Sequence, residues 1–162
     1  MTENVKMFKL KMILDAMIKY QKENNITREC VTNVQFLYRI VKTNFPELSV
    51  KVIPIIYFND FRTKSGEFYD IKIQTGHLVL EIEELGFLEC SYDMLDRLKT
   101  ATVYKTVKEC VENEPFFANK EAKKMLIENV LYFQKVANDM NAGEIMINDF
   151  NYFAKLHFSC IP

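Results

Sequence analysis

The sequence predicts an α+β fold for this chain of 162 residues. Apolar residues recur with the three-four spacing of amphipathic helices near both ends, and they alternate with polar residues in the middle. No repeat or low-complexity stretch separates these regions, so we expect a single domain over residues 1–162. Because helical patterns flank the strands, we expect N-terminal helices packed on a small antiparallel sheet, followed by C-terminal helices.

The first element is predicted as a helix over residues 4–22, with lysines opposite its apolar stripe. Asn24 or Asn25 is expected to end it in a left-handed conformation. Thr27 is the expected N-cap of a second helix that runs to about Lys42. The apolar stripe of the first helix consists of Leu10, Ile13, Leu14, Met17 and Ile18.

The middle of the chain is predicted to form strands. Residues 50–58 are rich in β-branched side chains, and Pro54 indicates an edge position or a bulge. A long polar turn separates this strand from a second one at 69–75. A hairpin then follows, with arms of roughly equal length at 77–83 and 87–93.

The last third is predicted to be helical. Residues 91–114 suggest one or two short helices, stopped by Pro115. Residues 118–140 form a strongly amphipathic pattern that the sequence Asn-Ala-Gly ends. The apolar tail after it is expected to form a short helix packed on the core.

Composition and charge exclude several function classes. The formal net charge is −1 and the basic residues are dispersed, which argues against nucleic acid as a partner. No apolar run approaches the roughly 20 residues of a membrane span, and the charged N-terminus is not a secretory signal. Four cysteines without a CxxC pair fit reduced thiols. We therefore expect a cytoplasmic protein with no membrane partner.

Three residues could form a thiol-hydrolase site, which needs a cysteine nucleophile, a histidine base and a group that orients the imidazole. Cys30 falls in the first turn of the second helix, where the helix dipole and free amides lower a thiol pKa. His77 opens a strand, on the face opposite its apolar side chains. On the returning strand, Glu89, Ser91 and Asp93 alternate onto the face beside His77.

The orienting acid has two candidates. A regular hairpin around residues 84–86 places Asp93 near His77, whereas Glu89 lies on the same face but nearer the turn. An oxyanion hole needs the backbone N–H of Cys30 and a second donor from upstream. Candidates for that donor are Gln21, Asn24 and Asn25.

The sequence motifs around these residues resemble the papain-like superfamily, particularly its transglutaminase-like and circularly permuted branches. In that group the histidine is followed by alternating apolar residues, an acid, a glycine turn, an apolar pair and Asp-Pro-Ser/Thr-Tyr. This chain has HLVLEIEELG and then FLECSYD, so Ser91 and Tyr92 match. Glu89 stands where the family has Asp, and Cys90 stands where it has Pro.

The nucleophile segment CVTNVQFLYRI is similar to the family's cysteine, asparagine and aromatic-rich helix, although Arg28 and Glu29 replace the usual Trp or Gly. The resemblance covers about residues 20–95, and residues 96–162 form a helical C-terminal extension outside it. It implies a helix on an antiparallel sheet, with Glu89 as the orienting acid.

The expected function is a cysteine-nucleophile hydrolase or acyltransferase that acts on a peptide, isopeptide or amide bond of a peptide or protein, without a cofactor or metal. Two alternatives remain open. One is an inactive protein of the same fold that serves as a structural or interaction module, with oligomers formed through the C-terminal helices. The other is a helical binding domain in which Cys30 and His77 never meet.

The structural interpretation of the same residues is simple. Cys30 shares a helical stripe with Val34, Leu37 and Val41, and free cysteines are often buried. Cys90 is expected to face the core and Cys110 to be structural. His157 and Cys160 are too few to build a metal site.

Overall fold

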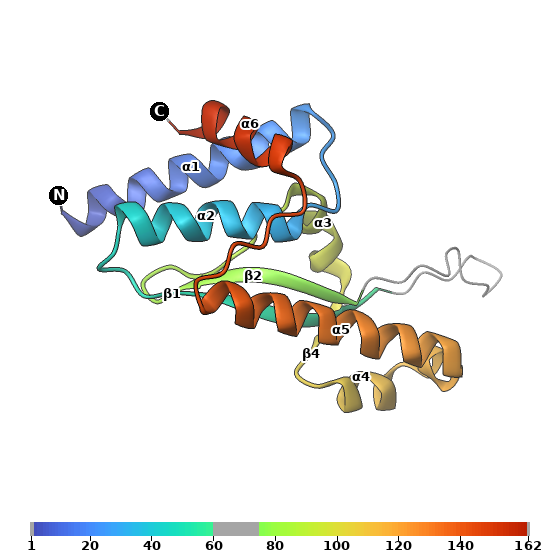
Figure 1. Cartoon of the computed structure of the whole chain (residues 1–162). Coiled ribbons are helices and arrows are strands. Elements are labelled where there is room, and N and C mark those ends of the chain that lie inside the picture. Colours follow the sequence, from blue (N-terminus) through green and yellow to red (C-terminus); the bar gives the residue numbers. More distant parts are fainter. Residues whose placement is uncertain (1, 60–74, 162) are drawn as a thin grey trace.

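The computed structural model describes residues 2–59 and 75–161. The described residues form an α+β fold with one antiparallel sheet of strand order β3-β2-β1-β4, and helices precede and follow it (Figure 1). The elements in chain order are α1 (Glu3–Glu23), α2 (Cys30–Asn44), β1 (Val50–Phe58), β2 (Gly76–Ile82), β3 (Gly86–Leu88), α3 (Tyr92–Thr100), β4 (Thr102–Tyr104), α4 (Val107–Asn113), the 3₁₀ helix η1 (Pro115–Ala118), α5 (Lys120–Asn141) and α6 (Phe150–Cys160).

The two N-terminal helices are confirmed, with one correction at their junction. Asn25 has a φ of 54°, which is the predicted left-handed helix end. Arg28 is also left-handed, with a φ of 59°, and the second helix begins only at Cys30. The prediction of Thr27 as N-cap was wrong, because the left-handed turn at Arg28 keeps the chain non-helical and makes Glu29 the N-cap.

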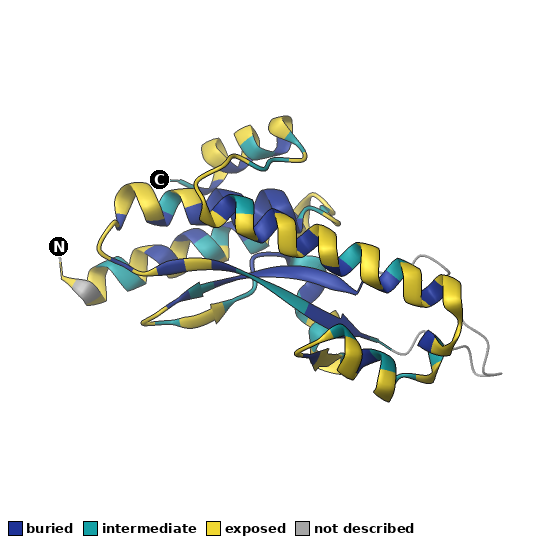
Figure 2. Cartoon of the chain, turned by 60° about the horizontal axis from the view of Figure 1, so that its bottom comes forward, coloured by how far each residue is buried: buried dark blue, intermediate teal, exposed yellow. Residues whose placement is uncertain are grey.

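Helix α2 is the central element of the fold. In Figure 1 it lies between the sheet and the pair of helices α1 and α6. Its side chains from Cys30 to Tyr38 are all buried, and Figure 2 shows the buried residues concentrated on α2 and β2. Each buried Val or Leu here contributes about 1.5–3 kcal/mol by leaving water. The helix that carries Cys30 is therefore held from several sides.

Strand β1 has an open edge over its first half, as Pro54 predicted. The pairing with β4 begins only at Ile56. Before that point the side chain of Asn141 takes the place of a strand: its Oδ1 accepts from the backbone N–H of Val52 at 2.8 Å and its Nδ2 donates to the Val52 carbonyl at 2.9 Å. Pro54 faces the same edge, two residues on, and its missing N–H costs nothing there.

The hairpin is shorter on its returning side than predicted. Strand β2 has 7 residues, but β3 has 3 and ends at Leu88. Ser91 is the N-cap of α3 and Asp93 lies in its first turn. Both residue types favour a helix start, which ends the strand early. The prediction that Glu89, Ser91 and Asp93 share a strand face was therefore wrong.

The remaining elements confirm most of the predictions for the last third. Helices α3 and α4 are the two short helices before Pro115, and α5 and α6 are the two later ones. Strand β4 was not predicted. Helix α6 packs on α1 and α2. The predicted strand at 69–75 and the polar turn before it lie outside the described residues, except for their end residues Asn59 and Thr75.

Candidate active site around Cys30 and His77

His77 is the centre of the candidate site. Its side chain is buried, with 0% exposure, and its Nε2 lies 2.9 and 2.8 Å from the two carboxylate oxygens of Glu89. A carboxylate only accepts hydrogen bonds, so Nε2 is the ring nitrogen that donates to Glu89, and in the neutral form of the ring Nδ1 carries the lone pair. Nδ1 is then an acceptor, and it is buried without a hydrogen-bond partner among the described residues. His77 therefore has one ring nitrogen bonded to Glu89 and one without a partner in the described part of the chain.

The end of β3 brings Glu89 to His77. Leu80 pairs with Leu88, so Glu89 is the first residue past the strand and lies diagonally across from His77. The backbone N–H of Ser91 donates to Glu89 Oε1 at 3.0 Å, which fixes the carboxylate. The hydrogen-bonding residue is thus the one that the family resemblance favours.

Asp93 has a different partner. Its Oδ2 accepts a hydrogen bond from the backbone N–H of Arg28 at 3.3 Å. The register of β2 and β3, continued beyond Leu88, would place Ser91 opposite His77, so the hairpin argument for Asp93 was wrong by two residues. Asp93 therefore holds the turn that precedes Cys30.

Cys30 lies at the start of α2 and against the strand that carries His77. The backbone amide of Leu78, the residue after His77, is near enough to the Cys30 sulfur to lower the pKa of the thiol. Leu78 lies two residues beyond the last β2–β3 pair, Leu80 with Leu88, so this edge of β2 has no β3 partner there. Cys30, His77 and Glu89 are therefore gathered at the point where β3 stops.

The Cys30 thiol is held in its neutral form. Burial raises its pKa to about 12, the amides of Leu78 and Val31 lower it, and the nearby carboxylates of Glu89 and Asp93 raise it further. The sequence predicted a thiol pKa lowered by the helix N-terminus, and that prediction was wrong in direction. Burial outweighs the helix terminus here because the side chain is only 6% exposed.

The three predicted oxyanion donors are placed differently. Gln21 is fully buried, and its Nε2 donates to the Cys90 carbonyl at 2.8 Å while its Oε1 accepts from the Tyr92 N–H at 2.8 Å. Its amide is thus engaged in holding the chain after Glu89. Asn24 and Asn25 are exposed at the end of α1, where the Asn24 amide donates to a carbonyl of the last turn. Both are helix-terminating residues.

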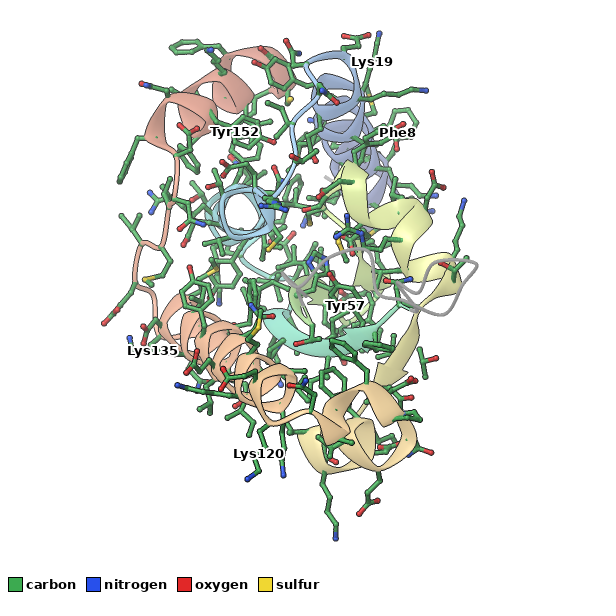
Figure 3. The ribbon with its side chains drawn as sticks, turned by 90° about the vertical axis from the view of Figure 1, so that its right-hand side faces the viewer. Phe8, Lys19, Tyr57, Lys120, Lys135 and Tyr152 are labelled. Atoms are coloured by element: carbon green, nitrogen blue, oxygen red, sulfur yellow. The ribbon has the colours of Figure 1, made fainter. Side chains whose placement is uncertain are left out.

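Tyr57 is a site residue that the sequence analysis missed. Its ring meets the His77 ring edge-on, with centroids 6.3 Å apart and an interplanar angle of 85°. Figure 3 shows Tyr57 in the interior, near the sheet. Burial raises its pKa and a hydrogen bond from Arg97 lowers it. Tyr57 lies two residues after Ile55, which pairs with His77 between β1 and β2. The sequence alone does not give that pairing, so it could not indicate Tyr57 as a neighbour of His77.

The other cysteines fit structural roles. All four thiols are free and buried. Cys90 and Cys110 are core residues with 0% exposure, as predicted. His157 is exposed while Cys160 is buried, and within residues 2–59 and 75–161 no group of three or more His, Cys, Asp or Glu side chains could hold a metal ion.

We compared the chain with protein-family models, curated proteins and solved structures, and none of these comparisons gave a match. No helix in the described part of the chain is both long enough and apolar enough to cross a bilayer. The site is therefore interpreted from its own geometry.

Proposed function

We propose that the chain is a cysteine-nucleophile hydrolase or acyltransferase of the papain-like or transglutaminase-like type, acting on a peptide, isopeptide or amide bond. One observation carries this proposal. His77 is oriented by both oxygens of Glu89 through Nε2, its buried Nδ1 has no partner among the described residues, and Cys30 begins the helix that packs on the strand of His77. A histidine held by a carboxylate, with a cysteine on the adjacent helix, supports nucleophilic catalysis. Among the described residues no hydrogen bond joins Cys30 to His77 Nδ1, so the thiol and the ring must approach each other before the proton moves.

The chemical steps follow from these roles. Nδ1 of His77 accepts the Cys30 thiol proton as the sulfur attacks the carbonyl carbon of the substrate. The imidazolium then protonates the departing amine as the C–N bond breaks, leaving a thioester on Cys30. Water attacks the thioester in a hydrolase, and an amine does so in an acyltransferase. Glu89 stabilises the imidazolium in each step.

The raised thiol pKa decides when the proton moves. With a pKa of about 12, Cys30 is a neutral thiol at rest. Proton transfer to His77 then accompanies the attack, rather than preceding it as a stable thiolate–imidazolium pair. Because the thiol is 6% exposed, a substrate carbonyl reaches it only if a neighbouring segment moves.

An activated acyl donor tests this function without knowledge of the substrate. The protein would be treated with 4-nitrophenyl acetate, and acetylated peptides would be mapped by mass spectrometry alongside the release of nitrophenolate. We expect a burst with acetyl on Cys30, lost in Cys30→Ser and strongly slowed in His77→Ala. Equal acetylation of Cys30, Cys90 and Cys110, or no effect of His77→Ala, would refute the proposal.

A second function, an interaction module on the same fold, is favoured by exposed apolar side chains on α5. Ile127, Leu131 and Tyr132 are 36%, 58% and 47% exposed, and Ile127 and Leu131 are one helical turn apart. Exposed apolar side chains one helical turn apart are a feature that protein contacts use. This function needs neither the thiol nor His77.

A groove between α1 and the end of α6 supports the same alternative. It has a volume of about 690 Å³, and the exposed side chains of Val5, Phe8 and Met12 line it together with Cys160 and the end of α2. Phe8 is labelled in Figure 3. Light scattering of the native protein, of Leu131→Lys and of Phe8→Lys would test for an oligomer. If all three proteins are monomers at high concentration, these surfaces do not form an oligomer.

A further inference from the structure

A buried chain of hydrogen bonds joins α6 to the segment that carries Glu89. The hydroxyl of Tyr152, on α6, donates to Asn33 Oδ1. The Asn33 Nδ2 donates in turn to Ser91 Oγ at 3.0 Å and to Gln21 Oε1 at 3.2 Å. Tyr152 is 4% exposed and the other three side chains are almost fully buried. Buried amides are costly unless they are bonded, so this arrangement is strongly specified.

The network ends on the backbone next to Glu89. Gln21 bonds the Cys90 carbonyl and the Tyr92 N–H, both at 2.8 Å. Between those two residues, Ser91 accepts from Asn33 through its hydroxyl and donates from its backbone N–H to Glu89 Oε1 at 3.0 Å. The backbone that holds the Glu89 carboxylate is thus fixed by side chains from α1 and α2.

Tyr152 is the outer end of this network. Figure 3 shows it on the side of α6 that faces α2. Its hydroxyl satisfies the Asn33 carbonyl oxygen, which leaves the Asn33 amide group free to donate to Ser91 and Gln21. Without that hydroxyl the Asn33 oxygen loses its donor, and the amide must rotate or stay unsatisfied. Either result weakens the hydrogen bond that Asn33 Nδ2 donates to Ser91 Oγ.

We propose that Tyr152 is a positioning residue for the His77–Glu89 pair, so that α6 is a working part of the site. Helix α6 lies outside the region that resembles the papain-like superfamily, and nothing in that resemblance assigns it a role. The consequence for catalysis rests on the proposed function. The effect on the His77–Glu89 hydrogen bond does not, because it requires only the contacts described above.

The test reads the histidine itself. The ¹⁵N chemical shifts of the His77 ring report which nitrogen carries the proton, and a loss of general stability does not change them. Tyr152→Phe removes only the hydroxyl. Tyr20→Phe is the matched control, because the Tyr20 ring stacks on Tyr152 with centroids 6.3 Å apart. Glu89→Gln gives the shifts of a histidine that has lost its carboxylate.

We expect Tyr152→Phe to move the His77 signals towards those of Glu89→Gln and Tyr20→Phe to leave them in place. We also expect the reaction of Cys30 with iodoacetamide to slow roughly two- to tenfold in Tyr152→Phe. Unchanged His77 signals in Tyr152→Phe would overturn the proposal. If that variant does not fold, Ser91→Ala breaks the network at its other end and is judged by the same signals.

The two proposals fail separately. If Tyr152→Phe moves the His77 signals while wild-type Cys30 reacts no faster than the other thiols, the positioning role stands and the hydrolase proposal falls. If Cys30 reacts selectively while the His77 signals do not respond to Tyr152→Phe, the hydrolase proposal stands and the positioning role falls.

Discussion

Nε2 of His77 lies within 2.9 Å of both carboxylate oxygens of Glu89, although Glu89 belongs to no strand. The pair depends on the chain leaving the sheet after Leu88. This pair predicts that the negative charge of Glu89 contributes more to the reaction of Cys30 than the shape of the side chain does.

Glu89→Gln is expected to fold like the wild type and to slow the reaction of Cys30 by about one to two orders of magnitude. The amide keeps a hydrogen bond to His77 but does not stabilise the imidazolium. The rate of acetylation by 4-nitrophenyl acetate measures the effect. Asp93→Asn is the matched control, because Asp93 bonds Arg28. An equal loss in both variants would contradict a specific role for Glu89.

Gly76→Ala is expected to destabilise the fold by about 1–3 kcal/mol. A Cβ at Gly76 would lie 2.5 Å from the Phe133 ring, so α5 must move away from the start of β2. The Asn129 Oδ1, which accepts from the Thr75 N–H at 2.9 Å, would move with it. Urea unfolding measures the change, and Phe133→Leu in the same chain should restore part of the loss. No destabilisation would show that the helix approaches less closely.

Stability is expected to fall in alkali, in part because of Cys30. Its folded pKa is about 12 against an ordinary value of 9.0, so the unfolded chain loses this proton first. The stabilisation is complete below pH 9 and is lost as the pH rises towards 12. Between pH 8 and 10, Cys30→Ala should lose about 1 kcal/mol less stability than the wild type in urea unfolding. Equal losses would mean that the folded thiol pKa is not raised.

The helices were predictable because each has a long apolar stripe. Those at 4–22 and 118–140 match α1 and α5 within two residues at each end. The sequence also shows a cysteine, a histidine and candidate acids in that chain order. Strand geometry alone did not identify the acid that bonds His77, because a hairpin register depends on where the turn lies, and the turn places Leu88 opposite Leu80.

The shared stripe of Cys30 with Val34, Leu37 and Val41 indicated that Cys30 is buried, and it is, but the local sequence did not indicate that burial outweighs the helix terminus. Cys30 has the helix-start position that lowers a thiol pKa, yet α1, α6 and the sheet enclose α2 and reverse the direction. The contacts of Tyr57, Asn33 and Tyr152 are tertiary as well. They join residues up to 119 positions apart, which no local pattern indicates.

The central claim is that His77 takes the proton of Cys30, and selective alkylation tests it most directly. The native protein would be treated with limiting iodoacetamide at pH 5 to 9, and the labelled cysteines would be mapped by mass spectrometry in the wild type and in His77→Ala. A thiol with a pKa of about 12 and no base would react about a thousandfold more slowly near neutral pH than an ordinary one. The account predicts that Cys30 is labelled ahead of the other three cysteines, and that His77→Ala abolishes this preference. Labelling of all four only on unfolding would contradict it.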